Sequence, residues 1–180
     1  RQRSKIKVVG CGGGGNNSLS RMREIGIKGG ELIAVNTDAQ DLLYANADSK
    51  ILIGKELTQG LGAGSNPRIG HESAKESEAE IKKKLGDCDM VFITCGLGGG
   101  TGTGAASVVA QVAKDTGSIV IGTVTMPFKI ERARVDKAEF GLQQLRQVCD
   151  TVIVIDNNRL VNIAGNLPIQ QAFAVANELV

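Results

Sequence analysis

Residues 98–104 read Gly-Gly-Gly-Thr-Gly-Thr-Gly, and residues 10–17 read Gly-Cys-Gly-Gly-Gly-Gly-Asn-Asn. Each stretch follows a short apolar run and precedes a helical pattern. Glycine lets backbone N–H groups come close to a ligand, and a helix that follows presents unpaired amides and the positive end of its dipole. One such loop could be a simple turn. Two of them at the ends of separate strands predict a single polyphosphate held from both sides.

Short runs rich in valine and isoleucine predict the strands, at residues 5–9, 32–35, 51–53, 90–94, 119–124 and 151–155. The apolar residues are continuous instead of alternating with polar ones, which is typical of strands buried on both faces. Because helical patterns lie between them, the chain is expected to form a three-layer, Rossmann-like α/β domain with a mainly parallel sheet. Ligands of such sheets bind outside the carboxyl ends of the strands, where both glycine-rich loops would lie.

Helices are expected at residues 18–25, 71–85, 103–114 and 135–148, with a last one from about 168 to the end. Residues 54–70 are expected to form a long loop that contains several glycines. A loop of that length is uncommon inside a compact domain, so it predicts a functional segment. The chain starts without methionine and stops inside the last helical pattern. We interpret it as a domain truncated within a helix that would lead to a second domain.

Composition narrows the classes of function. A formal net charge of +2 and an aromatic content of 3% argue against a nucleic-acid partner, which would need a basic stripe or stacking platforms. The cysteines lack metal-ligand spacing and are expected to be reduced core residues: Cys11, Cys88, Cys95 and Cys149. No apolar stretch approaches the length of a membrane span. A cytoplasmic protein with no membrane insertion is therefore expected.

The first loop leaves an alternative open. Its spacing Gly10-x-Gly12-x-x-Gly15 satisfies the dinucleotide fingerprint, and Asp38 follows the second predicted strand, where an acid that binds ribose would lie. An NAD-binding Rossmann dehydrogenase domain is thus the alternative hypothesis. Such a site has no use for the second glycine-rich loop, however, and residues 16–17 add two side-chain amides suited to a base or a phosphate.

The sequence contains no Gly-x-x-x-x-Gly-Lys-Ser/Thr motif, so it is not a P-loop NTPase. Phosphate charge must then be met by backbone amides, helix dipoles, hydroxyl groups such as those of Thr101 and Thr103, and a divalent cation. Phe173 and Asn177 are four residues apart and share one face of the last predicted helix. An aromatic ring beside an amide, which both donates and accepts hydrogen bonds, suits a purine base.

Several motifs in order along the chain resemble the tubulin/FtsZ GTPase family. They are the stretches 12–17 and 98–104, Val35-Asn36-Thr37-Asp38-Ala39-Gln40, Met126-Pro127-Phe128 and Ala172-Phe173. The resemblance runs from Lys5 to Val180. The first glycine-rich loop and residues 127–131 resemble archaeal members more than bacterial ones. It implies that residues 1–180 are the N-terminal GTP-binding domain of a prokaryotic cell-division GTPase, which polymerises head to tail into the protofilaments of the division ring.

The resemblance also implies a site for GTP or GDP with Mg²⁺. The phosphates would be held by Gly12, Gly13, Gly14, Gly15, Asn16, Asn17, Gly98, Gly99, Gly100, Thr101, Gly102, Thr103 and Gly104. The γ-phosphate would be sensed by a switch made of Ala63, Gly64, Ser65 and Asn66. Pro127 would border the site. Glu131, with Arg134 or Arg132, would contact the ribose, and guanine would be read by Asn157, Phe173 and Asn177. Asp38 would hold water around Mg²⁺, or would be a solvated carboxylate at a strand end.

In this family the next subunit inserts an acidic loop that positions the attacking water. The loop belongs to a C-terminal domain beyond residue 180, so the resemblance implies that residues 1–180 contain no catalytic residue and turn over little GTP alone. Membrane tethers of the division ring would bind segments that are also missing. Two departures from the family stand out: Arg134 follows Glu131 one residue early, and Asp156 stands where proline is common.

Overall fold

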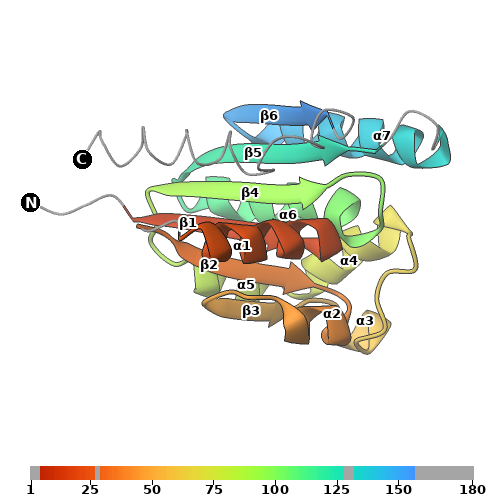
Figure 1. The fold of residues 1–180 in the computed structure, drawn as a ribbon, viewed down its shortest axis with the longest axis horizontal. Coiled ribbons are helices and arrows are strands. Elements are labelled where there is room, and N and C mark those ends of the chain that lie inside the picture. The colour runs from red at the N-terminus through yellow and green to blue at the C-terminus, as the bar shows by residue number, and fades with distance from the viewer. Residues whose placement is uncertain (1–4, 27–28, 128–131, 157–180) are drawn as a thin grey trace, which may run out of the picture.

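The computed structural model describes residues 5–26, 29–127 and 132–156 (Figure 1). Its centre is a six-stranded sheet in the order β3-β2-β1-β4-β5-β6, and every pair of neighbouring strands is parallel. The strands are β1 (Ile6–Cys11), β2 (Glu31–Asn36), β3 (Ser49–Leu52), β4 (Met90–Gly96), β5 (Ile119–Met126) and β6 (Thr151–Asp156). The predicted parallel α/β architecture is confirmed.

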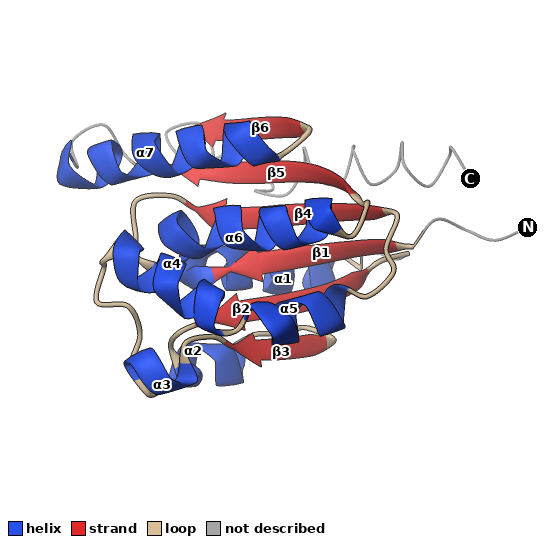
Figure 2. Ribbon diagram, turned by 180° about the vertical axis from the view of Figure 1, so that it is seen from behind, coloured by secondary structure: helices blue, strands red, loops and turns tan. Residues whose placement is uncertain are grey.

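Helices cover both faces of this sheet. One face carries α1 (Gly12–Ile25) and α2 (Ala39–Tyr44), which lie in front of the strands in Figure 1. The view from behind in Figure 2 shows the other face under α4 (Pro67–Glu76), α5 (Glu78–Leu85), α6 (Thr101–Asp115) and α7 (Arg132–Val148). The short α3 (Lys55–Thr58) lies beyond β3 at the edge of the sheet. The three predicted layers are thus present.

Two hydrophobic clusters hold the layers together. On the α1 face, Leu19 and Met22 are fully buried against Phe92 of β4. On the other face, a larger cluster joins the strands to α6 and α7 through residues such as Val109 and Leu145. Because alternate residues of the same strands enter opposite clusters, both faces of the sheet are apolar. This is the physical basis of the continuous valine and isoleucine runs.

Some of the predicted element boundaries were wrong. Residues 54–70 are not one loop, because α3 forms within them and α4 begins at Pro67. The side chain of Asn66 accepts a hydrogen bond from the amide of Arg68 and caps α4, with a proline at the first helical position. The single helix expected at 71–85 is two helices that meet at Ser77. The last predicted helix, from about residue 168, lies outside the described residues.

The glycine run at 12–15 belongs to the helix and does not precede it. α1 begins at Gly12, six residues earlier than predicted, and glycine there allows an unusually close approach to the sheet. A Cβ atom added to Gly15 would lie 2.8 Å from the carbonyl carbon of Gly10. Within the described part of the chain, no helix is both long and apolar enough to cross a membrane.

Candidate nucleotide-binding site

A pocket of about 890 Å³ opens at the carboxyl ends of the strands. It lies between the starts of α1 and α6, with the segment that leads into α4 on one side and the start of α7 on another. The residues that line it are Gly12, Gly13, Gly14, Asn17, Ser18, Arg21, Asn36, Thr37, Asp38, Asp41, Leu61, Gly62, Ala63, Gly64, Ser65, Gly96, Leu97, Gly99, Gly100, Thr101, Gly102, Thr125, Pro127 and Arg134.

The first wall of the pocket is the N-terminus of α1. Cys11 occupies the N-cap position but makes no side-chain hydrogen bond to the helix, and the first turn contains no acidic residue. The first amides of a helix have no partner inside the helix. Gly13 and Gly14 are exposed at this end, so their N–H groups are open to a ligand. Burial raises the pKa of the Cys11 thiol to about 12, so this side chain is neutral near pH 7 and adds no negative charge at the start of α1.

The second wall is the N-terminus of α6, which meets the first. Gly100 is its N-cap, again without a side-chain hydrogen bond, and its first turn also lacks acidic residues. A Cβ atom on Gly12 would lie only 2.8 Å from the backbone nitrogen of Gly102. The backbones of the two glycine-rich stretches are therefore in contact, and the positive ends of both helices face one pocket. Glycine is what permits this contact.

The third wall is the segment before α4, and hydrogen bonds fix it to the end of β2. The amide of Gly62 donates to the carbonyl oxygen of Thr37 at 3.2 Å. The hydroxyl groups of Thr37 and Thr101 are 2.6 Å apart, which ties this end of β2 to the first turn of α6. A Cβ atom on Gly100 would lie 2.9 Å from that of Ala63, so the segment packs directly on the start of α6.

The comparisons with known proteins agree with this geometry. A model of the tubulin/FtsZ family, GTPase domain, matches residues 5–165. The chain belongs to this family. It is 59% identical over 177 residues to cell division protein FtsZ 1 of Thermococcus kodakarensis and 56% identical over 177 residues to FtsZ 2 of Methanocaldococcus jannaschii. These matches cover 98% of this chain but 48% and 47% of those proteins, so the chain spans about half the length of these relatives.

Solved structures give the same result. An FtsZ dimer from M. jannaschii superimposes with a TM-score of 0.86 at 54% identity, covering 99% of this chain and 52% of that one. A GDP-bound monomer of CetZ1 from Haloferax volcanii has a TM-score of 0.76 at 27% identity, covering 97% and 57%. The resemblance to the family inferred from the sequence motifs is confirmed, and the alternative of a Rossmann dehydrogenase is set aside.

Most of the predicted phosphate-binding residues of this tubulin/FtsZ domain line the pocket. They are Gly12, Gly13, Gly14, Asn17, Gly99, Gly100, Thr101 and Gly102, together with Ala63, Gly64, Ser65, Pro127 and Arg134. The other predicted site residues in the described part of the chain are not among those that line the pocket: Gly15, Asn16, Asn66, Gly98, Thr103 and Gly104. Glu131, Asn157, Phe173 and Asn177 lie outside the described residues, so their roles at the ribose and the base stay predictions.

Asn16 was predicted to lie next to a phosphate, but the structure places its side chain in the interior, where it has a structural role. Its side chain is 4% exposed. Its amide nitrogen donates to the carbonyl oxygens of Gly10 at 2.9 Å and Val35 at 3.3 Å, and its amide oxygen accepts from the side chain of Asn36 at 2.9 Å. Asn16 thus joins the ends of β1 and β2 beneath the pocket. Asn17, one position later, is exposed and lines the pocket instead.

Three residues of the second glycine-rich stretch also support the wall. Thr103 is 3% exposed, and its hydroxyl accepts a 2.8 Å hydrogen bond from the amide of Gly98, which closes the loop on itself. Gly98 has φ +107°, which strongly favours glycine, and packs against Arg134. Gly104 faces α4, where a Cβ atom would lie 2.6 Å from the amide nitrogen of His71. These residues shape the loop that carries the open amides.

Asp38 is half-buried at the pocket, with one carboxylate oxygen already engaged. Its Oδ1 accepts hydrogen bonds from the amides of Gln40 and Asp41 and so caps α2. The other oxygen, Oδ2, would be 3.6 Å from a Cβ atom on Gly62, across the pocket wall. Asp38 therefore caps α2, a structural role that the sequence analysis did not predict. Its second carboxylate oxygen is not used by this cap.

Some residues of α1 and α2 that line the pocket were not predicted from the sequence. Ser18, Arg21 and Asp41 line the pocket, although none belongs to a glycine-rich stretch. A signal was present for Arg21, because it follows Asn17 by four residues and so shares its face of α1. Asp41 could not be found in this way, since α2 was not predicted at all.

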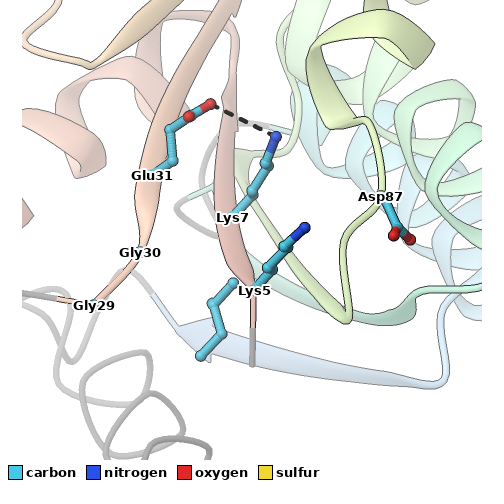
Figure 3. Close-up of a pocket in the computed structure, with 7 residues that line it drawn as sticks. Lys5, Lys7, Gly29, Gly30, Glu31 and Asp87 are labelled. Atoms are coloured by element: carbon cyan, nitrogen blue, oxygen red, sulfur yellow. Dashed lines mark ion pairs between the residues drawn. The ribbon is translucent and has the colours of Figure 1, made fainter. Parts of the chain in front are cut away.

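A second pocket, of about 440 Å³, lies at the opposite edge of the sheet (Figure 3). It is near the amino ends of β1 and β2 and carries both signs of charge, including Lys5, Lys7, Glu31 and Asp87. The Lys7 ammonium group lies 3.8 Å from the Glu31 carboxylate and donates to the carbonyl oxygen of Lys84 at 2.7 Å. The charges of Lys7 and Glu31 thus compensate each other, and within the described residues no glycine-rich helix start faces this pocket. It is therefore a weaker candidate for a polyphosphate.

Proposed function

We propose that this chain binds GTP and GDP in the pocket between α1 and α6. The observation that carries the proposal is the contact of two glycine-built helix N-termini whose first turns contain no carboxylate. Open amides and converging dipoles favour a polyphosphate at such a point. Membership of a GTPase-domain family supports guanine as the base, as does the GDP bound to the CetZ1 relative.

Different parts of the pocket would bind different parts of the nucleotide. Gly13, Gly14 and Asn17 at the start of α1 would hold the phosphates nearer the nucleoside. The amides of residues 99–102 would hold the terminal phosphates, with residues 63–65 closing over them. Arg134 would contact the ribose or a phosphate from the start of α7. Glu131, Asn157, Phe173 and Asn177 would complete the nucleoside site.

We also propose that Mg²⁺ accompanies the nucleotide. The described residues contain no group of three or more His, Cys, Asp or Glu side chains that could hold a metal ion. Mg²⁺ usually keeps several water ligands and binds through one or two carboxylates plus the phosphates of its nucleotide. The free Oδ2 of Asp38 fits this pattern, because it lies at the pocket and could accept hydrogen bonds from metal-bound water.

In the intact protein, of which we infer these residues to be the N-terminal domain, the bound GTP would be hydrolysed as subunits assemble head to tail. The matching dimer of M. jannaschii FtsZ supports self-association. Assembly would take place in the cytoplasm at the division site, with membrane tethers bound to other segments. Among the described residues, the carboxylates that line the pocket are Asp38, which is partly engaged as a helix cap, and Asp41. We therefore expect the chain alone to hydrolyse GTP slowly. Sustained phosphate release that rises with the concentration of the 180-residue chain would contradict slow turnover.

One titration series tests nucleotide binding. Calorimetry with GTP, GDP, ATP and NAD should give the tightest binding for the guanine nucleotides. Asn17→Ala removes a pocket amide and should weaken GTP binding by about tenfold. Asn46→Ala is the matched control, because Asn46 is also an exposed asparagine but does not line the pocket. The proposal fails if GTP does not bind at millimolar concentration, or if NAD binds as tightly as GTP.

A further inference from the structure

Lys137 of α7 makes a long-range hydrogen bond to the segment that precedes α4. Its ammonium group donates to the carbonyl oxygen of Ser65 at 2.8 Å, across 72 residues of sequence. Ser65 lines the nucleotide pocket, whereas Lys137 itself does not. We propose that Lys137 is a positioning residue: it holds residues 63–66 against the pocket and so sets how long a bound nucleotide stays. This inference rests on the proposed function of the pocket.

The segment that Lys137 contacts has a backbone that needs support. Gly64 and Ser65 both have φ +60°, in the left-handed region. Glycine adopts this conformation freely, but a residue with a Cβ atom does so only at an energetic cost, and such residues persist where the surroundings hold them. Ser65 is one of two residues other than glycine with positive φ in the described chain, the other being Gln59. A hydrogen bond to the carbonyl of Ser65 is well placed to hold it.

The two ends of the segment are anchored independently of Lys137. Ala63 is nearly buried and packs on Gly100 at the start of α6. Asn66 caps α4 with its side chain, and its amide donates to the carbonyl oxygen of Ala63 at 3.1 Å. Gly64 and Ser65, at the tip, are exposed. The tip is therefore the part whose position depends most on a bond from outside the segment.

Helix α7 gives Lys137 a rigid base. Ala138, Leu142 and Leu145 of this helix are buried in the main core cluster. The backbone of Gly141 lies against Thr103 of α6, where an added Cβ atom would be 2.8 Å from the Thr103 methyl group. Lys137 itself is half-buried, so its stem is partly fixed. The hydrogen bond to Ser65 thus connects an exposed segment with a left-handed backbone to a packed helix.

The same helix also reaches the pocket directly. Arg134 lies three residues before Lys137, so the two side chains project from neighbouring positions on one face of α7. Arg134 lines the pocket, and Lys137 holds the segment that forms the adjoining wall. α7 would therefore act on a bound nucleotide twice, once by a side chain at the rim and once through the carbonyl of Ser65. A nucleotide could leave more readily once the wall is released.

The test uses three variants of the 180-residue chain. Lys137→Met removes the donor while keeping a long apolar stem, and Lys137→Arg restores a cationic donor. Lys50→Met is the matched control, because the ammonium group of Lys50 also donates to a backbone carbonyl, that of Leu43 at 2.9 Å, away from the pocket. Dissociation of fluorescent N-methylanthraniloyl GTP and GDP is followed by stopped flow with excess unlabelled nucleotide. Hydrogen exchange of residues 61–66 is measured in the nucleotide-free chain.

Lys137→Met should release the nucleotides about three to ten times faster, as expected for loss of one hydrogen bond, and should increase exchange in residues 61–66. Lys137→Arg should return both values to within about twofold of the wild type, and Lys50→Met should change neither. The proposal is overturned if exchange at residues 61–66 is the same in Lys137→Met and wild type, or if Lys137→Arg behaves like Lys137→Met. Failure of the wild-type chain to bind any guanine nucleotide would instead overturn the proposed function and the effect on residence time with it.

Discussion

Replacing Gly104 by alanine tests the view that glycine lets α6 cross α4 at backbone contact. A Cβ atom on Gly104 would lie 2.6 Å from the amide nitrogen of His71 and 2.9 Å from the carbonyl carbon of Pro67. Real Cβ atoms do not approach other atoms this closely, so one helix must move. The atoms in the way are backbone atoms of α4, whose first turn is fixed by the Asn66 cap and by Pro67.

Two opposing effects set the size of the change. Alanine in a helix interior is more favourable than glycine by about 0.8–1 kcal/mol. Overpacking of a tight interior contact costs typically about 1–3 kcal/mol, and we expect the upper end because no flexible side chain can move aside. The free energy of unfolding should therefore fall by about 1–2 kcal/mol. In a domain of this size that corresponds to a Tm lower by about 2–8 °C.

The assay is thermal and urea unfolding of the 180-residue chain, followed by circular dichroism. Gly99→Ala serves as the control for stability, because a Cβ atom there would have no atom within 4 Å and the φ angle of Gly99 is not positive. Its Tm should stay within about 2 °C of the wild type. Gly104→Ala should also weaken GTP binding several-fold, since α4 carries residues 63–66 at its start. A Tm equal to or above that of the wild type would refute the reasoning, because helix propensity alone would then decide the outcome.

Further predictions concern buried and charged groups. Asn16→Leu should lower the free energy of unfolding by about 2–4 kcal/mol, because two buried backbone carbonyls lose their donor. Urea unfolding measures this loss, and a value below about 1 kcal/mol would contradict the structural role of Asn16. Burial raises the pKa of Cys11 to about 12 and that of Cys149 to about 11, so both thiols should react with Ellman's reagent at about pH 8 only after unfolding, and fast reaction of the native chain would argue against the packing. Because these pKa values lie above those of unfolded thiols, the stabilisation by the neutral forms is complete below about pH 8.5 and is lost as the pH rises through the folded values. Hydrogen bonds from the amide of Leu32 and from Arg23 lower the pKa of Asp48. The ionised carboxylate therefore stabilises the fold at neutral pH, and this stabilisation is lost as the pH falls below about 4. Asp48→Asn should reduce the loss of stability on acidification, and an acid transition equal to that of the wild type would contradict this role of Asp48.

The sequence predicted the parts of the fold that follow from local pattern. Continuous apolar runs identified all the described strands, and strand–helix alternation identified the parallel sheet and the edge where ligands bind. The two glycine-rich stretches were correctly placed at that edge. The short helix α2 was missed because its start depends on a single side chain, Asp38, whose two hydrogen bonds to the next amides cannot be seen in a periodic pattern. The break at Ser77 was missed because the charged pattern of residues 71–85 continues across it.

The roles of neighbouring residues could not be separated by sequence alone. Asn16 and Asn17 are chemically identical and adjacent, yet the first is buried beneath the pocket and the second lines it. Side chains at consecutive positions of a helix point about 100° apart. Which of the two faces the pocket depends on how α1 is rotated against the sheet. The same is true of Thr101 and Thr103, because only Thr101 lines the pocket while the hydroxyl of Thr103 closes its own loop.

By itself, the sequence determined that this protein is a parallel α/β domain of the tubulin/FtsZ family with glycine-built helix starts, since these properties depend on local composition and order. Only the tertiary structure decided that the two glycine-rich stretches touch at Gly12 and Gly102, that Asn16 supports the site without entering it, and that Lys137 reaches Ser65. The contacts of Gly12 with Gly102 and of Lys137 with Ser65 join residues far apart in the sequence, and those of Asn16 join a helix to two strands. All of them depend on how helices pack on the sheet. That packing is set by the shape of the whole core, and no short stretch of sequence encodes it.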